Sequence, residues 1–143
     1  MKFYIASDHA GFETKNYSIE YLRTKGHEVV DLGPSTNDRV DYPDFAKSVA
    51  KSVLSDSGSF GILVCGTGIG MSMTANKFKG IRAALCYCNF TAQMARSHND
   101  ANILCYGQRV VGVGQVESIL DGWCESSFEG GRHSDRVKKI ELD

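Results

Sequence analysis

The feature that most constrains the fold is a regular alternation of short apolar runs with longer amphipathic segments. The run Phe60–Cys65 is apolar throughout, which is typical of a strand buried on both faces of a parallel sheet. Between such runs, apolar residues recur at the three- and four-residue spacing of helices. The pattern predicts strands at 3–6, 28–32, 60–65, 82–87 and 102–106, and helices at 11–25, 43–54, 71–78, 91–97, 116–128 and 132–140.

This order predicts an α/β fold, a three-layer Rossmann-like sandwich in which helices cover both faces of a five-stranded parallel sheet. The length of 143 residues suits one domain, which we expect to span 1–143. A chain of this length buries enough surface to fold without a disulfide or metal staple. Glycine is frequent, with 15 residues against 2 prolines, as expected where strands turn tightly into helices.

Composition narrows the function classes. With 16 basic and 17 acidic residues the net charge is −1, which argues against a protein that coats nucleic acid but allows a small anionic ligand in a local basic cluster. The early charged residues argue against a secretory signal, and every apolar run is shorter than the ~18 residues of a membrane span. The five cysteines include no C-x-x-C pair, so we expect no disulfide framework, no structural zinc site and a cytoplasmic location.

Polar residues follow three predicted strands, where ligands of parallel sheets bind; the segments are Ser7–His9, Cys65–Gly70 and Tyr106–Gly107. In Cys65–Gly70, alternate glycines allow a tight turn that aims backbone N–H groups at one point, and the next helix adds positive charge. We interpret this loop as a cradle for a phosphate or an oxyanion, with a purely structural turn as the alternative. Its spacing departs from the dinucleotide-binding, P-loop and cysteine-phosphatase motifs.

Cys65 differs from the other cysteines, Cys86, Cys88, Cys105 and Cys124, which we interpret as buried small apolar residues. It ends a strand beside a helix N-terminus and a cluster of amides, an environment that lowers the pKa of a thiol. Its thiolate could act as a base or nucleophile, and a buried inert thiol is the alternative. Asp8 and His9 end the first strand, whereas His98 and Asn99 precede the last one, and this combination favours catalysis over isolated structural roles.

Basic residues near the end of the sequence suggest a phosphate site. Arg132 and Arg136 are four residues apart and share one face of the last predicted helix. Two guanidinium groups on one face suit a phosphate dianion, and a solvated terminal helix is the alternative. Arg109, just after the last strand, is a further candidate with weaker support.

Six segments, taken in order, are similar to the signatures of type B ribose-5-phosphate isomerases: Asp8–Phe12, Asp41–Pro43, Cys65–Gly70, Ala75–Lys77, His98–Asn102 and Glu129–His133. The resemblance covers nearly the whole chain, and the segments are specific jointly although each alone is modest. The wider family includes galactose-6-phosphate isomerase subunits and members that act on allose 6-phosphate.

The resemblance implies an aldose–ketose isomerase that interconverts ribose 5-phosphate and ribulose 5-phosphate without a metal or cofactor. Cys65 would move the proton between C2 and C1, and Thr67 would help to move protons on the oxygens. The enediolate would be stabilised by the amides of Gly66, Thr67, Gly68, Ile69 and Gly70. His98 would open the furanose ring with help from Asp8. The chain resembles the cysteine branch of the family, because the other branch has a glutamate where this chain has Met71.

The resemblance also implies how the substrate is held and how the subunits assemble. The phosphate would be bound by His9, Arg132 and Arg136, and the sugar or phosphate would be contacted by Asn99 and Arg109. The family forms homodimers or tetramers with shared active sites. In such an assembly the partner subunit would supply His98, Asn99 and Arg109.

Three alternatives stay open at this point. A hexose-6-phosphate isomerase would use the same chemistry in a slightly longer pocket. A non-catalytic nucleotide- or phosphate-binding module would use the glycine loop and leave the acid–base residues idle. A metal enzyme would use His9, His98, Asp8 and Cys65 as ligands, and its turnover would not survive chelation.

Overall fold

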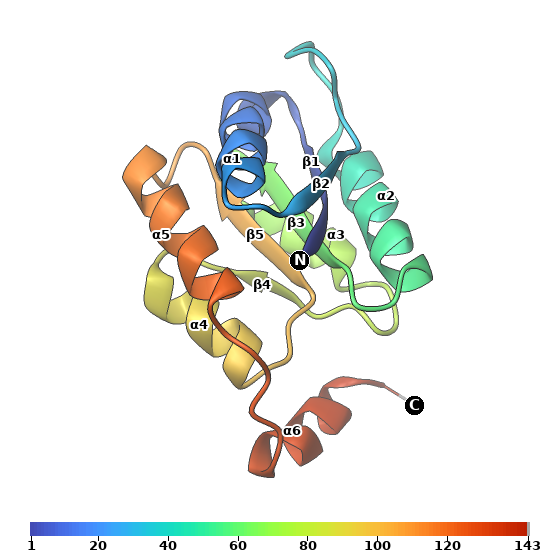
Figure 1. Cartoon of the computed structure of the whole chain (residues 1–143). Helices are drawn as coiled ribbons and strands as arrows, with labels where there is room; N and C mark the ends of the chain where they lie inside the picture. Colours follow the sequence, from blue (N-terminus) through green and yellow to red (C-terminus); the bar gives the residue numbers. More distant parts are fainter. Residues whose placement is uncertain (143) are drawn as a thin grey trace.

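The computed structural model describes residues 1–142 and contains a five-stranded, all-parallel sheet (Figure 1). The strands are β1 (Lys2–Ser7), β2 (Glu28–Asp31), β3 (Phe60–Cys65), β4 (Ala83–Leu85) and β5 (Ile103–Gly107), in the spatial order β2-β1-β3-β5-β4. The α/β class and the five parallel strands expected from the sequence are confirmed.

Helices cover both faces of this sheet (Figure 1). They are α1 (Phe12–Thr24), α2 (Tyr42–Ser55), α3 (Ile69–Ala75), α4 (Asn89–Ser97) and α5 (Val113–Cys124), and α6 (Arg132–Ile140) follows them in the chain. Buried residues of α1, α4 and α5 form one core with the strands, and those of α2 and α3 form the other. Helix α6 lies outside these layers, beyond the edge at which the strands begin (Figure 1).

Alternation along the central strand explains the two cores. In β3, Ile62 and Val64 face the core with α1, α4 and α5, whereas Leu63 and Cys65 face the core with α2 and α3. Successive side chains of a strand point to opposite faces, so a continuous apolar run is what a strand covered on both faces requires. Among the described residues, none of the helices has the length and apolarity needed to span a membrane.

Some helices and strands begin or end at other residues than expected, because side chains take the place of backbone groups as hydrogen-bond partners there. The expected strand 82–87 is only Ala83–Leu85, because the Arg82 amide donates to Asn102 Oδ1 and the Tyr87 amide donates to Thr91 Oγ1. The expected helix 11–25 is preceded by a short 3-10 turn, His9–Gly11, which the side chain of Asp8 caps.

Candidate active site

The loops that follow β1 and β3 lie side by side, because these two strands are neighbours in the sheet. The amide of Asp8 donates to Val64 O at 3.2 Å, and Asp8 Oδ1 accepts hydrogen bonds from Ala10 N at 2.9 Å and Gly11 N at 3.1 Å. A Cβ atom on Gly11 would lie 2.5 Å from Val64 O, so glycine is required for this close approach. The Asp8 carboxyl is thereby fixed beside the end of β3.

The thiol of Cys65 points into the turn that leads to α3. Its Sγ accepts a hydrogen bond from Gly68 N at 3.0 Å, and Cys65 is 5% exposed. Gly68 has φ +80° and ends the turn just before α3 begins at Ile69, a backbone conformation that favours glycine. Of the amides expected from the sequence to form a cradle, that of Gly68 thus donates to the sulfur itself. Thr67 is exposed, and its Oγ1 accepts from Ile69 N at 3.2 Å.

The end of β5 fixes this turn from the other side. Gln108 N donates to Cys65 O at 2.9 Å, and Arg109 N donates to Gly66 O at 3.0 Å. The Arg109 guanidinium lies over Gly66, 3.4 Å from the place that a Cβ atom would take there. This basic side chain therefore belongs to the neighbourhood of the Cys65 turn of its own chain. The expectation that Arg109 would be supplied by the partner subunit is corrected, because Arg109 directly follows β5 at the same edge of the sheet as Cys65.

Two further side chains border the same edge. His9 Nδ1 lies 3.2 Å from Val40 O, which holds the imidazole in the loop before α2. The ring of Tyr42 packs against Gly70, where a Cβ atom would meet it at 2.6 Å, and Tyr42 is 40% exposed. Sequence reasoning gave no role to Tyr42, although it lies in one of the family-like segments. We call the following residues the carboxyl-edge group: Asp8, His9, Tyr42, Cys65–Gly70 and Arg109.

The remaining candidate residues lie at the opposite edge of the sheet. His98 is the C-cap residue that follows α4 and it precedes β5, whereas Cys65 is the last residue of β3. In the register, Gly61 pairs with Ile103 and Cys65 pairs with Gly107. Four steps of roughly 3.3 Å therefore put about 13 Å of strand between the Cys65 level and the beginning of β5.

Helix α6 joins His98 at this edge. The His133 ring stacks on the His98 ring with centroids 4.2 Å apart and planes 12° from parallel. Glu129 N donates to Ser97 O at 3.0 Å, which ties the start of this segment to the end of α4. We call the following residues the amino-edge group: His98, Asn99, Arg132 and Arg136. One chain does not bring the two groups together, and Arg132 and Arg136 lie with His98 rather than with Cys65.

The charges at the amino edge act on the buried His133. Burial, with His98 and the Arg132 and Arg136 guanidinium groups nearby, lowers the pKa of His133 below its ordinary value, and Glu129 only partly opposes this. Protonation of the His133 ring that stacks on His98 is therefore disfavoured. Its role was not assigned from the sequence, although it is the last residue of the segment Glu129–His133.

One set of side chains has the composition of a metal site. Ligand atoms of His98, Glu129 and His133 lie within 4.8 Å of one another. The two rings are almost parallel, and because nitrogen lone pairs lie in the ring planes, both cannot point at one ion without rotation. The four-residue metal set considered from the sequence is divided between the two edges of the sheet.

The other cysteines are not a uniform group. Cys86 and Cys105 are buried, and burial raises the pKa of Cys86 to about 11 and that of Cys105 well above its ordinary value. Cys88 and Cys124 are only partly buried, and hydrogen bonds from Thr91 lower the pKa of Cys88. The expectation that all four are buried is therefore wrong for Cys88 and Cys124, because each lies at a helix end and stays partly exposed, although Cys124 packs against the core formed with α1, α4 and α5.

Fold and site together define an α/β protein with a thiol in a glycine-rich turn at the carboxyl edge of a parallel sheet. The sequence profile of the Ribose/Galactose Isomerase family matches residues 3–140. Ribose-5-phosphate isomerase B of Escherichia coli is 45% identical over 139 residues, which are 97% of this chain and 93% of that protein. The chain belongs to the ribose/galactose isomerase family, which confirms the resemblance found in its sequence.

Solved structures agree with this assignment. A ribose 5-phosphate isomerase from Thermotoga maritima shares 51% identity and a TM-score of 0.95, with 98% of this chain and 97% of that chain covered. Ribose-5-phosphate isomerase B from Mycoplasma genitalium, solved with bound ribulose-5-phosphate, shares 47% identity and a TM-score of 0.91, with 97% and 93% covered.

Proposed function

We propose that the protein is an aldose–ketose isomerase that interconverts ribose 5-phosphate and ribulose 5-phosphate. The observation that carries this proposal is the Cys65 thiol, held by an amide at the carboxyl edge of the sheet beside Asp8. The similarity to relatives named as ribose-5-phosphate isomerases, one of them with ribulose-5-phosphate bound, supports the choice of substrate.

Cys65 acts as the base. Its thiolate removes the proton from C2 of the open-chain aldose and returns a proton to C1, while a hydroxyl proton moves from O2 to O1 with the help of Thr67. The amides from Gly66 to Gly70 stabilise the enediolate formed in between. A positioned base contributes about 10²–10⁴-fold, and one donor to an oxyanion about 2.7–4 kcal/mol, so a single turn supplies two large contributions.

The complete site is formed by two chains. The carboxyl-edge group of one subunit receives the amino-edge group of another, because about 13 Å of sheet separates the two groups within one chain. His98 then opens the furanose ring with Asp8, and Asn99 contacts the sugar. The phosphate is bound by His9 and Arg109 of one subunit and by Arg132 and Arg136 of the other. The smallest such assembly is a homodimer with two equivalent sites, and a tetramer would contain two of these dimers.

Removal of the sulfur tests the proton transfer. Cys65→Ala should lower kcat for ribose 5-phosphate by about 10²–10⁴-fold, while titration calorimetry still detects substrate binding. The assays contain a chelator, so that undiminished wild-type turnover also excludes a required metal ion. Full activity of Cys65→Ala would refute the role of the thiol.

Mixed dimers test the shared site. A dimer of one Cys65→Ala chain and one His98→Asn chain has one doubly damaged site and one intact site. Random mixing of the two inactive variants should therefore restore about a quarter of wild-type activity, because half of the dimers are mixed and each has one working site. No recovery in verified mixed dimers would place both residues in a site within one chain.

A comparison of kcat/KM for ribose 5-phosphate, allose 6-phosphate and galactose 6-phosphate tests the preferred sugar.

A further inference from the structure

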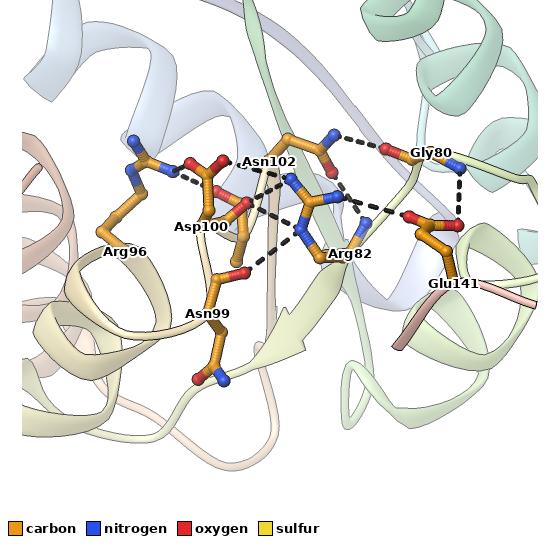
Figure 2. A network of polar contacts seen from close by, with 8 residues as sticks. Gly80, Arg82, Arg96, Asn99, Asp100, Asn102 and Glu141 are labelled. Atoms are coloured by element: carbon orange, nitrogen blue, oxygen red, sulfur yellow. Dashed lines mark hydrogen bonds and ion pairs between the residues drawn. The ribbon is translucent and has the colours of Figure 1, made fainter. Parts of the chain in front are cut away.

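Arg82, immediately before β4, holds the loop that follows His98, the residue proposed to open the ring from this edge (Figure 2). Its Nε donates to Asn99 O at 3.1 Å and to Asp100 O at 3.0 Å. Its Nη2 donates to Asp100 O at 2.8 Å and to Asp100 Oδ2 at 3.3 Å. The side chain is only 18% exposed, so its hydrogen bonds are largely shielded from water.

A second arginine, Arg96, binds the same loop. Arg96 Nη1 donates to Asp100 Oδ1 at 3.0 Å and to Ala101 O at 2.6 Å, and its guanidinium lies over the rings of Phe60 and Trp123. Asp100 has φ +46°, a left-handed conformation that is costly for a residue with a side chain. Both oxygens of one carboxylate are thus bound by two arginines at the point where the backbone is strained.

We propose that Arg82 is a positioning residue for the ring-opening step, which rests on the function proposed above. It fixes the backbone of Asn99 and Asp100 and thereby the angle at which His98 leaves the end of α4. The ring of His98 stacks on His133, and the loop that follows His98 fixes its backbone from the other direction along the chain. A displacement of about 1 Å of a catalytic group can cost roughly 10²-fold in rate, which makes this loop a sensitive support.

Arg82 also contacts the segment after α6, which provides a matched control. Its Nη1 lies 3.3 Å from Glu141 Oε1, and Gly80 N donates to Glu141 Oε2 at 3.3 Å (Figure 2). Glu141→Gln weakens the attachment of this segment but leaves every hydrogen bond from Arg82 to the 99–100 loop. Comparing Glu141→Gln with substitutions of Arg82 therefore distinguishes the support that Arg82 gives to the 99–100 loop from the support that it gives to the segment after α6.

The experiment compares two rates that differ only in the need for a ring step. Ribulose 5-phosphate cannot close a furanose ring, because its 5-oxygen carries the phosphate. In D₂O, Cys65 removes a proton from C1 of ribulose 5-phosphate, and the enediolate takes up a deuteron at C1, so NMR of this carbon reports proton transfer alone. Conversion of ribose 5-phosphate to ribulose 5-phosphate requires ring opening as well.

For Arg82→Met we expect conversion of ribose 5-phosphate to fall about 10²-fold, while deuterium entry into ribulose 5-phosphate falls less than about 3-fold. Arg82→Lys, which keeps the charge but donates from a single nitrogen, should recover part of the conversion rate and gives the same test if Arg82→Met does not fold. In Glu141→Gln both rates should stay within about 3-fold of wild type.

An equal loss of both rates in folded Arg82 variants would make Arg82 a general structural support and overturn the proposal. The same loss in Glu141→Gln would assign the effect to α6 and also overturn it. If the wild-type protein neither converts ribose 5-phosphate nor exchanges the C1 proton, the proposed function itself fails, and this outcome is distinct because it precedes any substitution.

Discussion

Gly107→Ala is the most direct test of how β5 supports the Cys65 turn. A Cβ atom at Gly107 would lie 2.4 Å from Thr67 Cα, 2.5 Å from Thr67 C and 2.6 Å from Gly66 O. Carbon contacts are favourable only beyond about 3.5 Å, so β5 and the turn must move apart by about 1 Å. Because the obstacle is backbone, no side-chain rotation can relieve it.

The cost of this movement has two parts. Overpacking a buried position costs about 1–3 kcal/mol. The movement also stretches the hydrogen bonds to Cys65 O and Gly66 O, each worth about 1 kcal/mol. We therefore expect the free energy of unfolding to fall by about 3–5 kcal/mol. For a chain of 143 residues, this corresponds to a Tm lower by roughly 10 °C, and a turn displaced by about 1 Å should lose roughly 10²-fold in turnover.

Urea and thermal unfolding measure the first effect, and turnover of ribose 5-phosphate measures the second. Gly114→Ala is the matched control, because a Cβ atom there meets nothing within 4 Å and Gly114 lies within α5. It should be neutral or stabilising by up to about 1 kcal/mol. A Gly107→Ala protein with wild-type turnover and a loss of stability below about 1 kcal/mol would refute the reasoning.

Three further predictions follow from buried charges and thiols. Because the pKa of His133 is lowered from 6.5 in the folded protein, the unfolded chain binds a proton at this residue at a higher pH than the folded one. The unfolding free energy should therefore fall as pH drops below about 6.5. Urea titrations should show a shallower fall with pH for His133→Gln, and equal slopes for the variant and the wild type would contradict this. Asp31→Asn should cost about 2–3 kcal/mol, because Lys15 is fully buried with Nζ 2.9 Å from an Asp31 carboxyl that is itself 37% exposed, and an unchanged urea midpoint would contradict it. Cys88 should be alkylated by iodoacetamide before Cys105, and the reverse order in mapped peptides would contradict these pKa shifts.

The strands were predictable because each is a short apolar run. Such runs are needed where the sheet is covered by a core on each face. The run from Phe60 to Cys65 could only be a strand covered on both faces, and that fixed the class of fold. The exact ends were not predictable, because they depend on single side-chain contacts such as those of Asn102 and Thr91. The contacts of Arg82 were also invisible in the sequence, since its partners lie at positions 99–100 and 141.

The geometry of the Cys65 turn was predictable locally, since the thiol, the alternate glycines and the start of a helix are contiguous. Tyr42 was not, because its contact with Gly70 depends on how α2 packs beside α3. The stacking of His133 on His98 likewise depends on where α6 folds back.

The division of the site between two edges follows from chain direction in a parallel sheet. A residue that follows a strand, as Asp8 and Cys65 do, lies at the carboxyl edge, and a residue that precedes a strand, as His98 does, lies at the amino edge. No loop movement within one chain can reverse this order, because it would have to carry His98 along the whole of β5. A twofold axis that places two chains head to tail would bring the two groups together, because the carboxyl edge of each chain then faces the amino edge of its partner. In the proposed dimer, proton transfer and ring opening depend on different chains, so dissociation should abolish turnover while each chain keeps its thiol and the neighbouring amides in place.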